Sequence, residues 1–303
     1  MQQGNIIKLP RVSVLMATFN GIDYLEEQIM SILSQKGVII SLFISDDCSD
    51  DDTVGLLERY KKKYDNIFIV SKNKKFGSAA KNFLSLLNDH DATNFDYIAL
   101  ADQDDIWLDS KIYRSINCLT KLNSLGYSSN VTSWKELSNL KNQIIFDHKQ
   151  TNYDFMFQGP GPGCSFVLKS DSAQKLILFI RSLSQSEVDQ IWFHDWLIYA
   201  FFRFNNHKWH IDNESHILYR QHDSNVLGAH EGIKASLKRM KLIYTKEYRQ
   251  QILFLSKVIG YERHLPIFKF NLFNFCLILS PFKTRRKPLH GLMLFILSVF
   301  RVF

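Results

Sequence analysis

The chain has 303 residues, of which 46% are hydrophobic and 22% charged, with a net charge of +7. This composition supports a large buried core and excludes an intrinsically disordered chain. The positive charge suits phosphorylated ligands, an anionic membrane surface or nucleic acid, and does not choose among them. The four cysteines show no CxxC spacing, so neither a zinc site nor a disulfide framework is expected, and the simplest environment is a reducing cytoplasm. No signal peptide is expected at the N-terminus.

The first hundred residues alternate between strand-like and helix-like patterns. Short apolar runs rich in strand formers predict strands over residues 12–17, 39–44, 66–70 and 96–100. Apolar residues at helical spacing predict helices over residues 22–33, 53–64 and 78–90. Strands that alternate with helices indicate a mostly parallel sheet with crossover helices.

The rest of the chain divides less clearly. Residues 111–155 contain helical stretches and an Asn/Ser-rich part at 123–133, so we interpret them as an insertion or long loop. Residues 164–230 contain a strand and helices, and the pattern becomes helical and basic from residue 231 onward. The prediction is one α/β domain over residues 1–230 and a C-terminal region over 231–303.

Three predicted strands end in polar residues. The first ends at Thr18-Phe19-Asn20, the second at Ser45-Asp46-Asp47, and the fourth at Ala101-Asp102-Gln103-Asp104-Asp105. In parallel sheets, ligands bind beyond the carboxyl ends of the strands. These side chains are therefore expected to meet at one rim.

The fourth strand end carries three carboxylates within four residues. Asp102, Asp104 and Asp105 repel one another unless a cation offsets their charge, and hard oxygen ligands favour Mg²⁺ or Mn²⁺. Such an ion would stabilise a diphosphate leaving group. The alternative is a solvated acidic turn that caps a helix.

The second strand end offers a base-recognition site. A carboxylate at Asp46 or Asp47 can accept a hydrogen bond from a pyrimidine N–H. The residues that follow, Ser49 to Asp52, are suited to cap the helix that begins near Thr53. Both roles can be divided among these residues.

Three sequences in order, VSVLMATFNGIDYLEEQIMSIL, ISDDCSDD and LADQDDIW, resemble the inverting family-2 glycosyltransferases of the GT-A fold. ADQDDIW in particular resembles bacterial rhamnosyltransferases of surface-polysaccharide assembly. The resemblance covers residues 11–110 and is looser over 155–230. It implies a GT-A α/β fold, a nucleotide-diphosphate sugar donor, and Mg²⁺ or Mn²⁺ as cofactor.

The resemblance also implies roles for matching positions. Asp102 would contact ribose or metal and Asp104 would ligate the metal, while Asp105 and Trp107 would shape the sugar pocket. Core packing is an equal alternative for Trp107. The nucleotide pocket and its base contact would be formed by Thr18, Asn20, Tyr24, Asp46 and Asp47.

An inverting transfer needs a general base for the acceptor hydroxyl. His194-Asp195-Trp196 lies where the family places its catalytic Asp, so Asp195 is the predicted base, with His194 orienting it or sharing the proton. The family more usually has Glu-Asp here. The alternative is an apolar helix face on which Asp195 is merely exposed.

Tyr219-Arg220-Gln221-His222 also resembles the rhamnosyltransferase group. Arg220 is predicted to meet the diphosphate, because a planar guanidinium pairs well with phosphate oxygens. His222 is predicted to complete the metal shell or bind phosphate, with a structural histidine as the alternative. Residues 159–163, GPGPG, form either a wall near the donor sugar or a simple turn.

The C-terminal region is apolar and basic. Segments 265–282 and 289–303 flank Lys283, Arg285, Arg286 and Lys287, and neither reaches the length of a membrane span. The pattern predicts a segment that lies on a membrane with its cations at the headgroups. A buried terminal helix pair is the alternative.

Together these features predict a glycosyltransferase, peripheral on the cytoplasmic face of the membrane. Its donor would be a dTDP- or UDP-sugar, with rhamnose the first choice, and its acceptor a lipid-linked saccharide. The alternative is a non-catalytic sugar-nucleotide-binding subunit of a membrane assembly. The sequence lacks the Gly-rich loops of nucleotidylyltransferases and dinucleotide-binding enzymes, and it lacks the QxxRW motif of processive synthases. A nucleic-acid partner is not expected.

Overall fold

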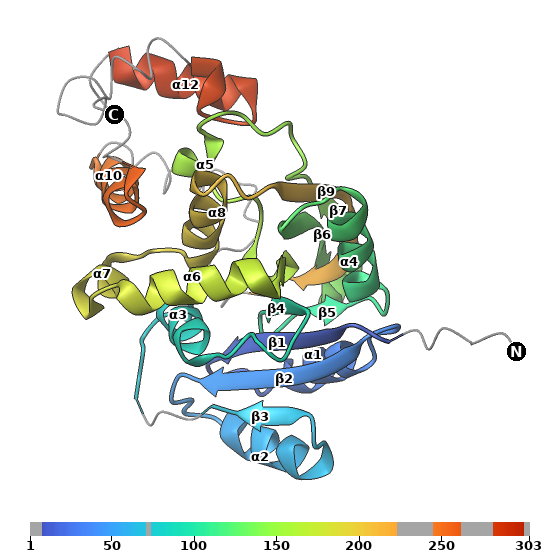
Figure 1. Ribbon diagram of the computed structural model, residues 1–303. Helices are drawn as coiled ribbons and strands as arrows, with labels where there is room; N and C mark the ends of the chain where they lie inside the picture. Colours follow the sequence, from blue (N-terminus) through green and yellow to red (C-terminus); the bar gives the residue numbers. More distant parts are fainter. Residues whose placement is uncertain (1–7, 71–73, 223–244, 262–280, 300–303) are drawn as a thin grey trace, which may run out of the picture.

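The computed structural model describes residues 8–70, 74–222, 245–261 and 281–299. Within them, the centre is one mixed sheet with the order β3-β2-β1-β4-β8-β6-β9-β5, and β7 pairs with β6 (Figure 1). The N-terminal strands are mutually parallel, as predicted. They are β1 (Arg11–Thr18), β2 (Ile39–Asp46), β3 (Ile67–Ile69) and β4 (Tyr97–Ala101).

Alternate residues of β1 enter two separate cores. Val12, Val14 and Met16 pack on the face covered by α1 (Leu25–Leu33), α2 (Thr53–Lys63) and α4 (Lys111–Lys121). Leu15 and Ala17 pack on the opposite face, against α3 (Ala79–Asp89), α6 (Ser170–Ser182) and α8 (His194–Phe204). A strand covered on both faces is a continuous apolar run, which is why this strand was recognisable in the sequence.

The second half of the sheet differs from the mostly parallel sheet that was predicted. β4 pairs antiparallel with β8, β8 with β6, and β9 with β5, whereas β6 and β9 run parallel. The α/β layers of the prediction are confirmed, but the sheet is mixed. The strands of this half are β5 (Ile106–Trp107), β6 (Gly126–Lys135), β7 (Leu140–Ile144), β8 (Val167–Lys169) and β9 (Trp209–Arg220).

The interpretation of residues 111–155 as an insertion or long loop is wrong. They contain α4 and the long strand β6, which lies between β8 and β9 in the sheet. The Ser/Asn-rich residues are buried in this strand because other parts of the chain satisfy their polar atoms. Asn130 donates to Asn213 O at 3.0 Å, and Ser128 Oγ accepts from Trp209 Nε1 at 3.0 Å.

The remaining helices include α5 (Asp154–Phe157), α7 (Gln185–Gln190), α10 (Glu247–Val258) and α12 (Pro288–Val299). Short 3₁₀ turns occupy Glu136–Ser138, Gly163–Ser165 and Pro281–Lys283. Ile252 and Leu255 of α10 and Leu294 of α12 join the core that α8 lines. The predicted boundary at residue 230 falls in 223–244 and most of the apolar segment 265–282 falls in 262–280, both outside the described residues. Among the helices of the described ranges, none has the length and apolarity needed to cross a membrane.

Candidate active site

The ends of β1 and β2 are joined by a network of short polar side chains. Asp46 accepts from Thr18 Oγ1 at 2.9 Å, and its other oxygen accepts from Ser49 N at 2.8 Å. Asn20, in the left-handed region at φ 49°, donates its N–H to Ser49 Oγ and accepts from Asp50 N at 2.7 Å. The predicted nucleotide-binding residues Thr18, Asn20 and Asp46 therefore form one rigid loop pair.

Asp47 is buried and faces the next crossover. Its two carboxylate oxygens accept from the backbone N–H groups of Phe76 and Gly77, the latter at 2.8 Å. Each carboxylate oxygen keeps a second lone-pair direction after accepting one bond. Asp47 thus orders the segment before α3. A hydrogen bond from the nucleotide base would be added to the two that its carboxylate already accepts.

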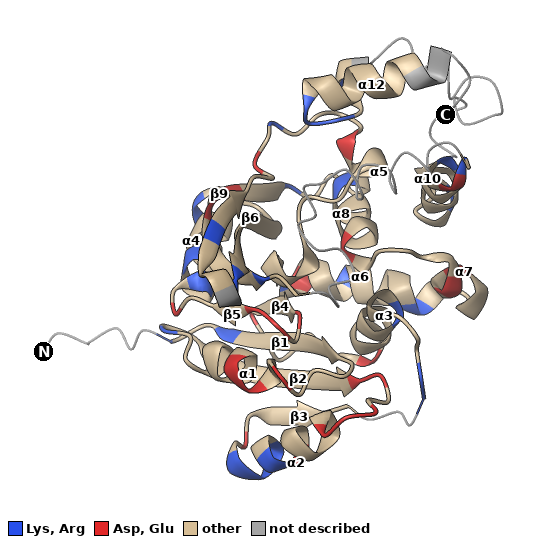
Figure 2. Ribbon diagram, turned by 180° about the vertical axis from the view of Figure 1, so that it is seen from behind, with Lys and Arg blue, Asp and Glu red and all other residues tan. Residues whose placement is uncertain are grey.

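The loop after β4 is fixed to β1 and α1 by two glutamines that the sequence did not single out. Gln103 Oε1 accepts from Phe19 N at 2.8 Å, and Gln103 Nε2 donates to Phe19 O at 2.9 Å. Buried Gln28 of α1 donates to Asp102 O at 3.0 Å. Gly21 leaves the space that Gln103 fills, because a Cβ there would lie 2.5 Å from Gln103 Oε1. Figure 2 shows the acidic positions of this loop in red between β4 and β5.

The sugar-pocket role predicted for Asp105 and Trp107 does not fit their burial. Asp105 is fully buried and accepts from Arg220 N at 3.2 Å, while Trp107 is 2% exposed and packs in the core. The ammonium of buried Lys111 lies 3.4 Å from the centre of the Trp107 ring. Burial lowers the pKa of Lys111 to about 7, although the charge of Asp105 opposes this shift. These side chains support the acidic loop from beneath.

Asp102, Asp104 and Asp195 share one electrostatic environment, although Asp195 lies about ninety residues further along the chain. Burial, together with the charges of Asp104 and Asp195, raises the pKa of Asp102 to about 7. Burial raises the pKa of Asp195, at the first turn of α8, to about 6, while the N–H of Trp196 lowers it. Asp104 and Asp195 therefore both lie near enough to Asp102 for their charges to affect its pKa.

Two of the three residues predicted to hold a metal, Asp104 and His222, lie in contact. His222 Nε2 lies 2.8 Å from Asp104 Oδ2, and the imidazole stacks on Tyr24 with ring centres 4.9 Å apart. A cation between Asp104 and Asp102 would relieve the repulsion that raises the pKa of Asp102. Carboxylate oxygens with one imidazole are a suitable donor set for Mn²⁺ or Mg²⁺. Asp104 and His222 therefore fit the ion that the sequence implied, while the carboxylate of Asp102 lies closer to Asp105 and Cys164 than to this pair.

Arg220 is buried. The prediction that it meets a diphosphate assumes an accessible side chain. Its guanidinium pairs with Glu27 and Glu136 and donates through Nε to Asp104 O at 2.9 Å. It lies between the rings of Tyr24 and Trp134, at 4.7 and 4.8 Å from their centres. A diphosphate would have to replace at least one glutamate, so in this structure Arg220 fixes the main chain of the metal loop.

His194 does not contact Asp195 by a hydrogen bond. Its ring stacks on Phe83 with centres 4.1 Å apart, and its buried Nε2 has no hydrogen-bond partner among the described residues. Burial lowers the pKa of His194 to about 3, so the ring is neutral. A Cβ at Gly163 would lie 2.5 Å from this nitrogen, so the predicted turn at 159–163 is fitted to the histidine.

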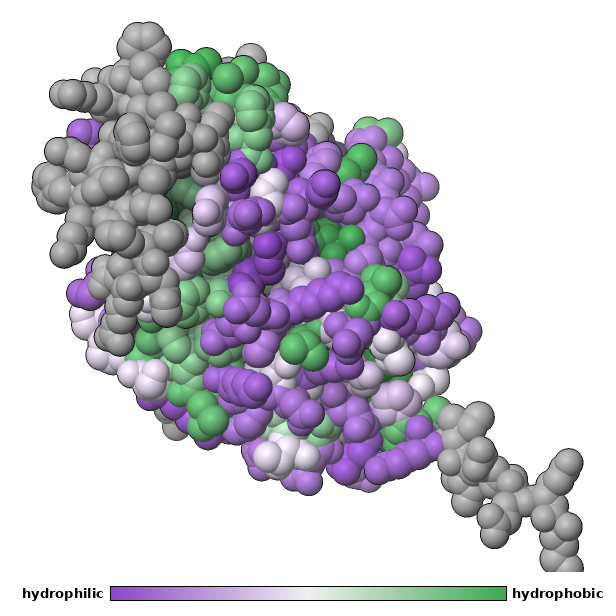
Figure 3. All heavy atoms as spheres, turned by 45° about the horizontal axis from the view of Figure 1, so that its top comes forward, coloured by the Kyte–Doolittle hydropathy of each residue, from purple (hydrophilic) through white to green (hydrophobic). Residues whose placement is uncertain are grey.

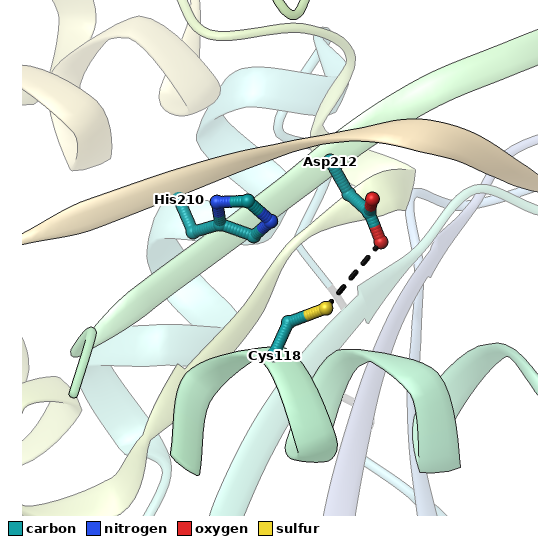
Figure 4. Close-up of side chains that lie close together, drawn as sticks. All are labelled: Cys118, His210 and Asp212. Carbon is teal, nitrogen blue, oxygen red and sulfur yellow. Dashed lines mark hydrogen bonds between the residues drawn. The ribbon is translucent and has the colours of Figure 1, made fainter. Parts of the chain in front are cut away.

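A second group of potential metal ligands lies outside this site (Figure 4). Cys118, His210 and Asp212 approach one another, and the Cys118 thiol donates to Asp212 at 3.5 Å. Asp212 is already bound by Arg114, whose Nε and Nη2 donate at 2.8 and 3.0 Å, and by the Tyr127 hydroxyl at 2.9 Å. Burial raises the pKa of Cys118 to about 11, which keeps the thiol protonated. The group is a satisfied structural network and does not fit a metal.

Comparison with known proteins gives a family match and a full-length relative. The sequence profile of glycosyl transferase family 2 matches residues 13–175. A relative from Shigella flexneri, named dTDP-rhamnosyl transferase RfbG, is 38% identical over 291 residues, which cover 95% of this chain and 100% of the relative.

Two solved structures share the fold. Staphylococcus aureus TarS, residues 1–349, in complex with UDP-GlcNAc, superposes with a TM-score of 0.54 at 15% identity, over 96% of this chain and 82% of that one. The mannosyltransferase PcManGT from Pyrobaculum calidifontis, in complex with GDP-Man and Mn²⁺, superposes with a TM-score of 0.53 at 13% identity, over 98% and 88%.

Proposed function

The chain belongs to glycosyltransferase family 2, and on that premise we propose that it transfers rhamnose, with inversion, from a dTDP- or UDP-linked donor to a lipid-linked saccharide of cell-surface polysaccharide. The observation that carries the proposal is the sheet rim at which the loops after β1, β2 and β4 are hydrogen-bonded and His222 lies 2.8 Å from Asp104. The charges of Asp104 and Asp195 both raise the pKa of Asp102 in this rim. Rhamnose is the first choice because the Shigella relative, aligned over its whole length, is named for it.

Asp195 is the proposed base. With its pKa raised to about 6 by burial, its carboxyl is ionised at neutral pH and is more basic than an ordinary aspartate. It takes the proton of the acceptor hydroxyl as that oxygen bonds to the anomeric carbon, opposite the diphosphate. The bond between this carbon and the diphosphate oxygen breaks, and the configuration inverts. The neutral ring of His194 is proposed to fix the start of α8.

The donor is proposed to lie across the loops after β1, β2 and β4. Thr18, Asn20 and Tyr24 would line the nucleotide, and Asp47 or Asp46 would accept the N–H of the base. Arg220 would exchange Glu27 or Glu136 for phosphate oxygens, because both glutamates are half exposed and readily rehydrated. When bound at Asp104, Asp102 and His222, Mg²⁺ or Mn²⁺ would supply the positive charge that stabilises the departing nucleoside diphosphate.

The acceptor is proposed to be lipid-linked, which would place the protein in the cytoplasm, peripheral on the inner face of the membrane. Support comes from composition: residues 263–303 contain no Asp or Glu and seven Lys or Arg. Such a segment favours an anionic surface.

A donor screen tests the proposal. The purified protein is incubated with dTDP-rhamnose and UDP-sugars, with Mn²⁺ or Mg²⁺, and release of nucleoside diphosphate is followed. Asp195→Ala and Asp104→Ala should each lower turnover by roughly a hundredfold or more, as loss of a general base or a charge-stabilising group does. Asp171→Ala, on the exposed face of α6, is the matched control. Parent-like turnover in the Asp195 and Asp104 variants would refute the site, and binding without turnover would favour a non-catalytic subunit.

A further inference from the structure

α12 presents an apolar face to solvent. Leu289, Leu292, Met293 and Ile296 are 73%, 40%, 44% and 45% exposed, and their spacing places them along one side of the helix. Phe282, in the turn before the helix, is 61% exposed. The opposite side of α12 packs inward through Leu294, which is 4% exposed. Figure 3 shows the resulting hydrophobic patch in green at the top of the molecule.

The cations beside this face divide into two pairs, which corrects the expectation that all four lie at lipid headgroups. Arg286 is 9% exposed and donates to Asp154 at 3.2 Å and to Gly159 O at 2.7 Å. Arg285 donates to the Tyr248 hydroxyl at 2.7 Å. Lys283 and Lys287 are exposed and form no ion pair with a described residue. Of these four cations, Lys283 and Lys287 are therefore the two that are exposed to solvent.

We infer that this docking face, formed by Phe282, Lys283, Lys287, Leu289, Leu292, Met293 and Ile296, binds the surface of an anionic lipid bilayer. The side chains are those of an interfacial helix: apolar residues on one side and cations at its border. A second copy of the chain is disfavoured as the occupant, because each copy would bring Lys283 and Lys287 and no acidic side chain to the contact. The same charge is complementary to anionic headgroups.

The docking face is rigidly connected to the catalytic helix. Lys283 O accepts from Tyr153 N at 3.0 Å, and Arg286 holds the segment to Asp154 and Gly159. Gly159 in turn lies against the backbone of Trp196, the residue after Asp195. Docking would therefore fix the orientation of α8 relative to the bilayer. The proposed function enters only as the reason for docking, because it makes the acceptor lipid-linked.

Vesicle co-sedimentation of the full chain tests the inference. The parent should bind vesicles of phosphatidylcholine with phosphatidylglycerol and bind far more weakly to phosphatidylcholine alone. Lys283→Gln with Lys287→Gln should weaken binding roughly fivefold for each lysine removed. Leu289→Ser with Leu292→Ser should weaken it by roughly tenfold or more. The matched controls are Lys61→Gln with Lys62→Gln on α2 and Leu178→Ser on α6, all of which are exposed.

The outcomes separate docking from catalysis. Unchanged binding of both double variants, equal binding to neutral vesicles, or self-association in place of vesicle binding would each overturn the docking face. Parent-like thermal unfolding of the variants excludes misfolding as the cause of a loss. Vesicle binding without any release of nucleoside diphosphate would contradict the proposed function and leave the docking face supported. Nucleotide release that depends on Asp195, without vesicle binding, would remove only the docking face.

Discussion

The side chain of Gln103 forms a two-point hydrogen-bonded contact with the main chain of Phe19, accepting from its N–H at 2.8 Å and donating to its carbonyl at 2.9 Å. This contact joins the end of β1, where the nucleotide is proposed to bind, to the acidic loop after β4. Gln103 lies inside the motif that pointed to metal binding, yet its own function is to hold two loops in register.

Removing that contact should weaken metal binding at the proposed donor site more than it lowers the stability of the fold. Gln103→Ala deletes two hydrogen bonds at a partly exposed position, so we expect a loss of about 1 kcal/mol in the free energy of unfolding. The Mn²⁺ concentration for half-maximal turnover should rise several-fold, because Asp102 and Asp104 flank the freed residue. Urea unfolding and metal titration measure both. Equal metal dependence in parent and variant would contradict the role of Gln103.

Gly163 and Gly159 form a matched pair for testing how His194 supports α8. Gly163→Ala places a methyl group 2.5 Å from His194 Nε2, whereas at Gly159 the nearest atom is 3.8 Å away. The first substitution should displace the ring from Phe83 and cost about 1–3 kcal/mol of stability. It should also lower kcat roughly tenfold or more, since misplacing a catalytic group is costly. Gly159→Ala should retain most of the stability and most of the kcat of the parent. Equal losses in the Gly163 and Gly159 variants would be evidence against a close fit between Gly163 and His194.

Burial of Asp195 predicts an acidic limb in the pH profile. At saturating Mn²⁺, kcat/KM should rise through about pH 6, because the base must be ionised. The stability effect has the opposite sign. A carboxyl whose folded-state pKa is raised loses stabilisation as pH rises from about 4 to 6. Asp195→Asn should therefore be about 2 kcal/mol more stable than the parent at pH 8 and similar to it at pH 4, as measured by urea unfolding. A pH-independent difference would argue against a raised pKa.

Local patterns were sufficient to predict the parallel half of the sheet. β1 is apolar on both faces. The loops that end β1, β2 and β4 do meet at one rim, where Thr18 donates to Asp46 and Gln103 pairs with Phe19. β6 was missed because Ser128, Ser129 and Asn130 have the composition of a loop. Their partners, such as Trp209 and Asn213, lie about eighty residues away and cannot be identified from spacing.

The candidate site shows the same limit. Arg220 was predicted to meet the diphosphate, but its partners Glu27 and Glu136, which are 193 and 84 residues distant, could not be identified from the sequence. Trp107 carries no local sign of being buried rather than exposed. The four basic residues at 283–287 look alike in the sequence, and it is the distant partners Asp154 and Gly159 that hold Arg286 inward. Residue types and strand ends predict where a site lies, whereas the tertiary partners decide which side chains remain available in it.

Asp154 allows a test of the attachment of the C-terminal segment to the catalytic domain. This fully buried carboxylate accepts from Tyr199 at 2.7 Å, Arg203 at 3.1 Å and Arg286 at 3.2 Å. Asp154→Asn keeps the volume but leaves two guanidinium groups without their counter-ion, so we expect a loss of about 3 kcal/mol in urea unfolding. Arg286→Met should cost less, because Arg203 still neutralises the carboxylate.

Both variants should also expose the segment that Arg286 holds. Trypsin cleavage after Lys283 should be faster than in the parent, since local opening no longer has to break the Asp154 contact. Asp171→Asn, on the surface of α6, is the control and should change neither stability nor cleavage. If Asp154→Asn stayed within about 0.5 kcal/mol of the parent, the range typical of surface substitutions, and were cleaved at the parent's rate, Asp154 would not be what fixes α12 beside α8.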